Sequence, residues 1–149
     1  MSADWVLVDT NVFVYATDEA SPFCPAASAF LDVAGQGSFV ACVAPQILLE
    51  FVSVVTNPKR VAVARSAEEA WTTAEAIADA FMVLQPPVDL FERALTLGRT
   101  LGMRKQDVFD LTLGLTALAS DVTRVCTYDS SLFSKLPGLT AERPESFLT

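Results

Sequence analysis

The sequence predicts an α/β fold in which a mainly parallel sheet carries helices on both faces. Two observations predict it: short, valine-rich apolar runs recur along the chain, and longer segments with helical spacing of apolar residues lie between them. Strands that alternate with helices form mainly parallel sheets. The length of 149 residues, 52% of them hydrophobic, is enough for the core of one ordinary domain. We therefore expect a single domain over residues 1–149.

Three short apolar runs have the composition of buried strands: residues 3–8, 38–43 and 123–129. The first run stops at Asp9, and the third ends in Asp129. Because parallel strands point the same way, both carboxylates would project from one edge of the sheet. Ligands bind at this edge, beyond the carboxyl ends of the strands.

Helices are predicted between and after these strands, at residues 11–16, 25–34, 45–58, 66–84, 89–101 and 108–119. Pro45 begins the third helix and Pro58 stops it. Ser66, with Glu69 three residues later, forms a capping-box pattern at the start of the fourth. Gly102 closes the fifth.

The composition excludes several kinds of catalytic site. The chain has no histidine, so Ser-His-Asp and Cys-His nucleophiles, histidine acid–base chemistry and histidine metal sites are absent. Its three cysteines, Cys24, Cys42 and Cys126, are odd in number and widely spaced, which indicates neither disulfides nor a zinc site. An enzyme with this composition must use carboxylates or a cofactor.

The apolar runs are interrupted well before the ~20 residues that a membrane span needs, and a signal-type segment is missing from the N-terminus. We therefore expect a cytoplasmic protein without membrane contact. Ten basic and eighteen acidic residues give a net charge of −8, the wrong sign for general adhesion to nucleic acid. A nucleic-acid function would need local compensation of this charge.

Four carboxylates interrupt apolar segments: Asp9 and Asp129 at strand ends, and Glu50 and Asp110 within helices. Taken singly, each has a structural explanation, because acids after strands cap helices and acids in helices pair with arginine. If the four converge, each pair about 5 Å apart repels by about 3 kcal/mol at an effective dielectric of about 20. Mg²⁺ or Mn²⁺, which prefer oxygen ligands, would relieve this repulsion and support phosphodiester hydrolysis.

Four segments, in this order and at these intervals, resemble the PIN domain, in particular the VapC-type ribonuclease toxins of bacterial toxin–antitoxin pairs. They are VLVDTNVFVYA, PQILLEFVSVVTNPKR, VFDLTLGLTALAS and VCTYDSSLFSKLPGL. The resemblance implies a three-layer α/β/α PIN-like fold and a Mg²⁺- or Mn²⁺-dependent endoribonuclease that leaves a 5′-phosphate and a 3′-hydroxyl. By position, it implies that the catalytic and metal-binding acids are Asp9, Glu50, Asp110 and Asp129.

The resemblance also implies supporting roles for two polar residues. Asn11 and Thr127 match positions that orient a metal-bound water or a ligand carboxylate; hydrogen bonding in the turn and at the strand end is the alternative. One departure concerns Asp129, because the family usually has phenylalanine three residues after this acid, whereas Phe133 is four residues after it. We therefore expect the local loop to differ from that of the family.

Asp107 lies three residues before Asp110 and competes with it for the third position. The small and apolar residues that follow Asp110, namely Gly114, Thr116 and Ala117, match the family's spacing and favour Asp110. Small side chains on this face would also let another backbone approach closely. Asp107 is better explained as an acidic residue at a helix N-terminus.

Basic residues near the proposed site are Lys59, Arg60 and Arg65 after the Glu50 helix, and Arg104 and Lys105 before the Asp110 helix. Arg104 and Lys105 in particular are candidates for RNA-phosphate contacts, and a solvated surface is the alternative. Metal bound to the four acids would offset their charge, which moves the net charge from −8 to −4.

The sequence disfavours one other class of enzyme. A phosphatase of the HAD type needs a second aspartate two residues after the first, and position 11 is asparagine. A housekeeping RNA-processing nuclease and a catalytically silent binding module stay open. The VapC resemblance implies a small VapB-like antitoxin as partner, whose C-terminal segment blocks the acidic pocket, together with a homodimer and a toxin–antitoxin hetero-oligomer. Residues 45–56 and 66–84 could supply the apolar surfaces for these contacts.

Overall fold

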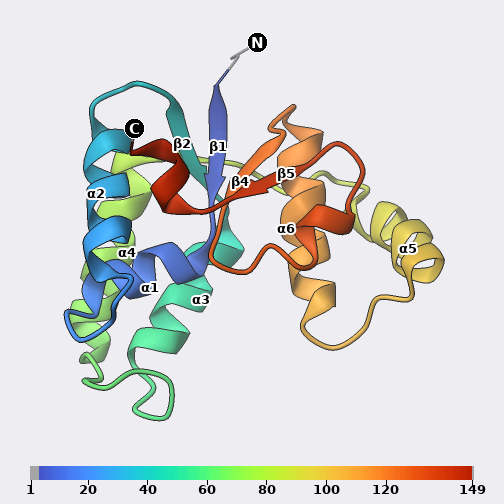
Figure 1. Cartoon of the computed structure of the whole chain (residues 1–149). Helices are drawn as coiled ribbons and strands as arrows, with labels where there is room; N and C mark the ends of the chain where they lie inside the picture. The colour runs from blue at the N-terminus through green and yellow to red at the C-terminus, as the bar shows by residue number, and fades with distance from the viewer. Residues whose placement is uncertain (1–3, 149) are drawn as a thin grey trace.

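The structure is a computed structural model that describes residues 4–148, and five strands form its sheet in the order β3-β2-β1-β4-β5 (Figure 1). The strands are β1 (Trp5–Val8), β2 (Val40–Val43), β3 (Met82–Val83), β4 (Arg124–Cys126) and β5 (Thr140–Glu142). Each of the four strand pairings is parallel. The predicted α/β fold with a mainly parallel sheet is therefore confirmed.

Within residues 4–148, six α-helices flank the sheet: α1 (Thr10–Thr17), α2 (Cys24–Gly35), α3 (Pro45–Val55), α4 (Ala67–Ala80), α5 (Leu90–Leu101) and α6 (Asp107–Ala119). Two short 3₁₀ turns, η1 (Phe133–Lys135) and η2 (Pro144–Phe147), lie near the C-terminus. Figure 1 shows α1 to α4 on one side of β1 and α5 and α6 on the other, which gives the three-layer arrangement. None of the helices in the described part of the chain is long and apolar enough to cross a bilayer.

Local sequence signals account for several helix ends. Asp9 is the N-cap of α1 and accepts a hydrogen bond from the Thr10 amide at 2.8 Å. Ser66 and Glu69 form the predicted capping box at the start of α4, with both reciprocal hydrogen bonds at 3.1 Å. Gly102 ends α5 with a φ of 63°, a left-handed conformation that glycine adopts without a steric penalty.

Two strands were not predicted, and one predicted helix is too long. The helix expected to reach residue 84 ends at Ala80, because the chain turns at Phe81 and pairs Met82 and Val83 with β2. Apolar spacing does not distinguish a last helical turn from so short a strand. β5 has only one apolar residue, Ala141, and is held by its pairing with β4.

The predicted strands are shorter in the structure than in the prediction. The run 3–8 begins at Trp5, with residue 3 outside the described residues, and the run 38–43 begins at Val40. The run 123–129 ends at Cys126, so Asp129 lies on the loop that follows β4 rather than at the strand end. The strand direction nevertheless brings this loop to the same edge as Asp9, because β1 and β4 are parallel neighbours.

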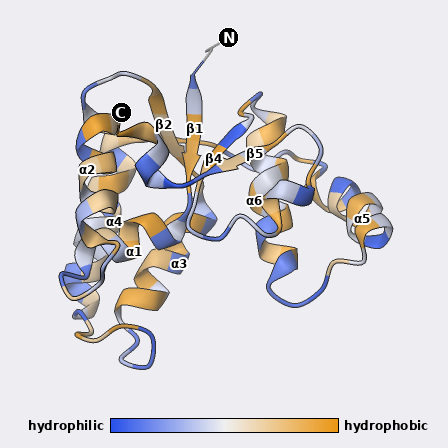
Figure 2. Cartoon of the chain, in the orientation of Figure 1, coloured by the Kyte–Doolittle hydropathy of each residue, from blue (hydrophilic) through white to orange (hydrophobic). Residues whose placement is uncertain are grey.

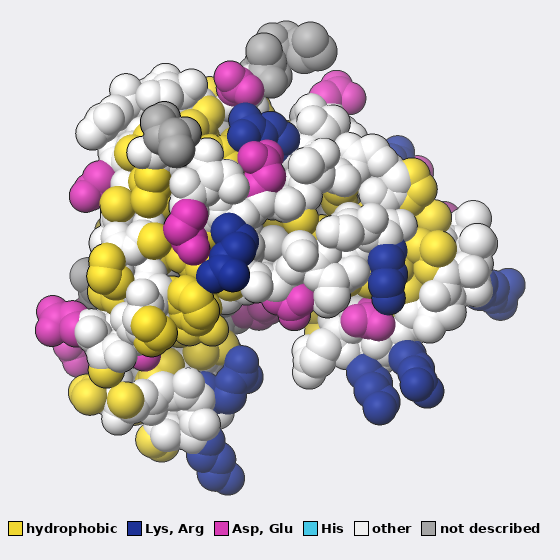
Figure 3. Space-filling model, viewed as in Figure 1, with side chains coloured by type: hydrophobic (Ala, Val, Ile, Leu, Met, Phe, Trp, Pro, Cys, Tyr) yellow, Lys and Arg dark blue, Asp and Glu magenta, His cyan; other side chains and the backbone are white. Residues whose placement is uncertain are grey.

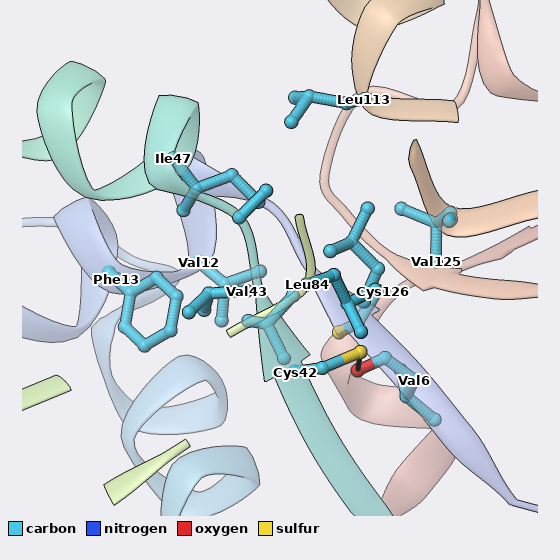
Figure 4. Close-up of a cluster of buried hydrophobic side chains, with 14 of the residues drawn as sticks. Val6, Val12, Phe13, Cys42, Val43, Ile47, Leu84, Leu113, Val125 and Cys126 are labelled. Carbon is cyan, nitrogen blue, oxygen red and sulfur yellow. Dashed lines mark hydrogen bonds between the residues drawn. The ribbon is translucent and has the colours of Figure 1, made fainter. Parts of the chain in front are cut away.

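The core lies on both faces of β1, whose residues Val6, Leu7 and Val8 are all fully buried. Such continuous burial is typical of a central parallel strand covered by helices on both faces. Figure 4 shows side chains from the strands and from α1, α3 and α6 packed around β1, and Figure 2 shows hydrophobic residues concentrated in these elements. Cys42 and Cys126 belong to this core, whereas Cys24 is only partly buried, and the three cysteines are free.

Gly114 gives α6 a close contact with the segment after η1. A Cβ atom at this position would overlap Leu136 Cδ1 and lie 3.0 Å from Leu139 Cδ1. The small-residue face of α6 is thus confirmed as a site of close approach, but leucine side chains approach it rather than another backbone.

We expect Gly114→Ala to destabilise the protein by about 1–2 kcal/mol, because two buried leucines must shift to admit the methyl group. Gly98→Ala on α5 is the control, since its Cβ would lie 3.6 Å from Leu111 Cδ2, an ordinary contact, and alanine favours a helix. Urea unfolding of both variants measures the difference. Equal stability of Gly114→Ala and the parent protein would contradict this account.

Candidate active site

The four sequence-predicted acids come together in one cleft at the carboxyl edge of the sheet. Asp9 follows β1, Glu50 lies on α3, Asp110 lies in the first turn of α6, and Asp129 follows β4. All four line a cleft of about 360 Å³. In Figure 3 acidic side chains lie in the hollow between the two halves of the molecule, with basic side chains on both sides below it.

Asp9 is the most buried of the four, at 8% exposed. Its Oδ1 accepts a hydrogen bond from the Thr10 amide, and its Oδ2 accepts one from Thr127 Oγ1, each at 2.8 Å. Burial raises the pKa of Asp9 to about 6, with smaller increases from Glu50 and Asp129, while the two hydrogen bonds act in the opposite direction. Asp9 is thus a carboxylate whose negative charge is only partly compensated by the protein.

Thr127 and Asn11 connect Asp9 to the loop that carries Asp129. The Thr127 hydroxyl donates to Asp9 and accepts from Asn11 Nδ2 at 3.2 Å and from the Asp129 amide at 3.0 Å. The Asn11 side chain also accepts a hydrogen bond from the Tyr128 amide at 3.1 Å. Both residues therefore position a carboxylate and the β4 loop, whatever further ligand they contact.

Asp110 faces the same acids from α6. Partial burial, followed by the charges of Asp9, Asp129, Glu50 and the neighbouring Asp107, raises the pKa of Asp110 to about 7. No side-chain hydrogen bond to Asp110 occurs among the described residues. Its charge is therefore exposed to repulsion from the other acids without a partner to offset it.

Glu50 is held by side chains that sequence reasoning missed. Gln46 Nε2 donates to Glu50 Oε1 at 2.7 Å, and the Thr10 hydroxyl donates to Glu50 Oε2 at 3.2 Å. Thr112 on α6 donates to Gln46 Oε1 at 2.6 Å, which links α3 to α6. The spacing of Gln46 and Glu50, four residues apart on one helix, was the available sequence signal.

Asp129 and Asp107 are the exposed acids of the region. Asp129 Oδ1 accepts hydrogen bonds from the Ser131 amide and hydroxyl, which fix it at the start of the β4–η1 loop. Phe133 is fully buried despite its shifted spacing, so the loop still anchors in the core. Asp107 begins α6, as predicted, and does not line the cleft.

The basic residues distribute unevenly around the cleft. Arg60 lines it, whereas Arg65 donates from Nη2 to the Thr17 carbonyl at 2.9 Å and so supports the end of α1. Arg104 and Lys105 are exposed in the loop before α6 and are not among the residues that line the cleft. Lys59 is exposed beside Arg60.

The donor set of the cleft fits a hard divalent cation. Among the described residues, no three acidic side chains are grouped closely enough to hold one ion jointly in this arrangement. Mg²⁺ does not require three, because it binds through one or two carboxylates and completes its shell with water and substrate phosphate oxygens. The raised pKa values of Asp9 and Asp110 indicate the unrelieved negative charge that such an ion would neutralise.

Comparison with known families identifies the class. The sequence matches the PIN domain over residues 6–139, which is most of the chain. The chain therefore belongs to the PIN domain family. A comparison with curated protein sequences finds no match.

Solved structures with this fold include several toxins. VapC20 of Mycobacterium tuberculosis, a Sarcin-Ricin loop cleaving toxin, is 16% identical with a TM-score of 0.71, over 93% of this chain and 99% of that one. VapBC2 of Rickettsia felis, bound to a DNA fragment from its promoter, is 15% identical with a TM-score of 0.68, over 93% and 98% of the two chains. VapBC-1 of nontypeable Haemophilus influenzae is 13% identical with a TM-score of 0.67, over 94% and 98%. At these identities the likeness is one of fold.

Proposed function

We propose that this chain is an endoribonuclease that hydrolyses RNA phosphodiester bonds with Mg²⁺ or Mn²⁺ bound in the acidic cleft. The observation that carries the proposal is the meeting of Asp9, Glu50, Asp110 and Asp129, from four separate segments, in one cleft. A structural ion pair does not explain them, since no salt bridge to any of the four occurs among the described residues. Carboxylates left uncompensated at the ligand edge of a parallel sheet are a functional arrangement.

The four acids and their hydrogen-bond partners would have distinct roles in this reaction. Asp9 and Asp110 would hold the cation, whose positive charge would lower their raised pKa values. Thr127, Asn11 and the Thr10 amide keep the Asp9 carboxylate in one orientation. Glu50, held by Gln46 and Thr10, and Asp129 would add negative charge to the cleft and accept hydrogen bonds from the water molecules that complete the ion's shell. A divalent ion held by these residues would supply the chemistry of water activation and of charge stabilisation on the phosphate.

The proposed biological role is that of a toxin in a VapBC-type pair that inhibits translation or growth. It is supported by the fold shared with VapC and VapBC structures. The proposed partners are a VapB-like antitoxin and a second copy of the chain. An apolar groove of about 490 Å³ between α3 and α4, lined by Leu48, Leu49 and the half-exposed Trp71, supports the prediction that these helices provide a docking surface.

The proposed activity is tested directly by asking whether RNA cleavage requires a divalent metal ion. We expect single-stranded RNA to be cleaved in Mg²⁺ or Mn²⁺, and cleavage to stop with EDTA or with Asp9→Asn, because either change removes the cation from the cleft. Asp32→Asn, at an exposed acid of α2 outside the cleft, is the charge-matched control and should cleave normally. EDTA-resistant cleavage, or full activity of Asp9→Asn, would contradict the proposal.

The toxin role is separated from a housekeeping nuclease and from a silent binding module by different observations. A short gene for a DNA-binding antitoxin directly upstream favours the toxin, and growth arrest on expression, relieved by that partner, tests it. Cleavage without growth arrest favours RNA processing. A protein that binds RNA without cutting it in either metal is a binding module.

A further inference from the structure

Three aromatic rings form a cluster beside the acidic cleft. Tyr15 comes from α1, Phe23 precedes α2, and Tyr128 follows β4, and their ring centroids lie 5.0 Å (Tyr15–Phe23), 5.3 Å (Tyr15–Tyr128) and 4.7 Å (Phe23–Tyr128) apart. Tyr15 also lines the cleft, and Tyr128 directly precedes Asp129. This ring cluster is therefore continuous with one wall of the cleft.

Arg143 lies on the ring cluster. Its guanidinium carbon is 4.9 Å from the centroid of Tyr128 and 5.3 Å from that of Phe23, which are cation–π distances. Arg143 Nη2 is 3.5 Å from Glu145 Oε2, and the Tyr128 hydroxyl donates to Glu145 Oε1 at 3.0 Å. The side chain of Arg143 remains 52% exposed, so a positioned guanidinium is available to solvent on the ring cluster, whose Tyr15 lines the cleft although Arg143 itself does not.

A polyanion that enters this cleft needs such a cation. The protein carries a net charge of −8, and Arg60 is the only basic residue among those that line the cleft in the described chain. Other arginines are engaged elsewhere: Arg65 with the Thr17 carbonyl, and Arg124 with Glu142 and Asp4. A planar guanidinium binds phosphate oxygens through two parallel hydrogen bonds, and one already immobilised loses less entropy on binding.

We infer that Arg143 contacts a backbone phosphate of the RNA strand that occupies the acidic cleft, and that Phe23 and Tyr128 hold its guanidinium in place. This inference rests on the proposed function and names a binding residue for the same site. The sequence predicted phosphate contacts for Arg104 and Lys105. It did not indicate Arg143, because the packing of this side chain on rings from distant segments is visible only in the fold.

RNA binding measured without cleavage tests the inference. The parent is the Asp110→Asn variant with Mg²⁺, and the probe is a fluorescein-labelled single-stranded RNA followed by anisotropy over a salt series. We expect Arg143→Gln to weaken binding roughly three- to tenfold and to reduce the slope of log K against log salt by about 0.7, the value for one phosphate contact in single strands. Arg143→Lys keeps the charge without the planar group and should give an intermediate loss.

Arg93→Gln is the matched control. Arg93 is also an exposed arginine with a carboxylate partner, since its Nε is 3.0 Å from Asp89 and its side chain is 47% exposed. It lies on α5, the outermost helix in Figure 1. The substitution changes the net charge by the same amount and should leave RNA affinity and the salt slope close to those of the parent.

A second variant acts in the opposite direction. Glu145→Gln removes the carboxylate that competes with phosphate for Arg143 but keeps an acceptor for the Tyr128 hydroxyl, so we expect roughly two- to fivefold tighter binding. In the Arg143→Gln background this gain should disappear, because it acts through the guanidinium. An equal gain in both backgrounds would show a general charge effect and count against the inference.

The outcomes separate this inference from the proposed function. If the wild-type protein cleaves RNA and Arg143→Gln binds as tightly as its parent at every salt concentration, the inference alone is overturned. The inference alone is also overturned if Arg143→Gln and Arg143→Lys lower the unfolding temperature without changing RNA affinity, since Arg143 then stabilises the fold and does not bind RNA. If the wild type neither cleaves nor binds RNA, both are overturned.

Discussion

Replacing Asp110 with asparagine is expected to abolish RNA cleavage and, at the same time, to stabilise the metal-free protein. The amide has nearly the shape of the carboxylate but no charge for a cation to neutralise, so we expect activity to fall by at least roughly a hundredfold. Partial burial, and after it repulsion from Asp9, Asp129 and Glu50, raises the pKa of Asp110, and both penalties disappear with its charge. Because Asp110 is partly solvated, the gain in stability at pH 8 should be on the order of 1 kcal/mol.

Cleavage assays in Mn²⁺ and urea unfolding in EDTA measure the two effects. Asp107→Asn is the matched control: it removes the same charge one helical turn earlier on α6, at an exposed residue outside the cleft. It should retain cleavage. A folded Asp110→Asn protein with full activity would remove Asp110 from the catalytic site, and a variant less stable than the parent would show that this carboxylate supports the fold.

The second large effect is a loss of stability of the metal-free protein as the pH rises. The pKa of Asp9 is raised from 3.8 to about 6 and that of Asp110 from 3.8 to about 7. Both groups therefore bind a proton more tightly in the folded than in the unfolded chain, so their stabilising contribution is complete below about pH 4 and is lost as the pH rises through 6 to 7. The pKa of Glu69 is lowered by its hydrogen bonds with Ser66. Glu69 therefore changes the stability only as the pH falls below its ordinary pKa of 4.5, which is outside this range.

We expect the free energy of unfolding in EDTA to fall by on the order of 2 kcal/mol between pH 5 and pH 8, after allowance for the solvation of Asp110. Mn²⁺ at pH 8 should restore it, because the cation replaces the protons as the neutralising charge. The Asp9→Asn/Asp110→Asn double variant should show a flatter pH profile and little response to Mn²⁺. Stability that increases from pH 5 to pH 8 without metal would contradict the geometry of the cleft.

Much of the fold was predictable because its signals are local. Pro45, the Ser66–Glu69 capping box and Gly102 mark helix ends within a few residues, and the Val6–Val8 run marks a strand buried on both faces. β3 and β5 were not predicted, because backbone hydrogen bonds to neighbouring strands hold them in place. Such bonds do not require a recognisable pattern of side chains.

The sequence by itself determined that carboxylates, rather than histidine or cysteine, must carry any catalytic chemistry, and which four interrupt apolar segments. Only the tertiary structure decided that these four share a cleft, because convergence depends on the parallel pairing of β1 with β4 and on the packing of α3 and α6 around the sheet. It also decided which polar residues hold them. Thr10 contacts Glu50 across 40 residues of chain, and Thr127 contacts Asp9 across 118. Thr112 on α6 holds Gln46 on α3 across 66 residues. Such long-range contacts are set by packing rather than by local sequence.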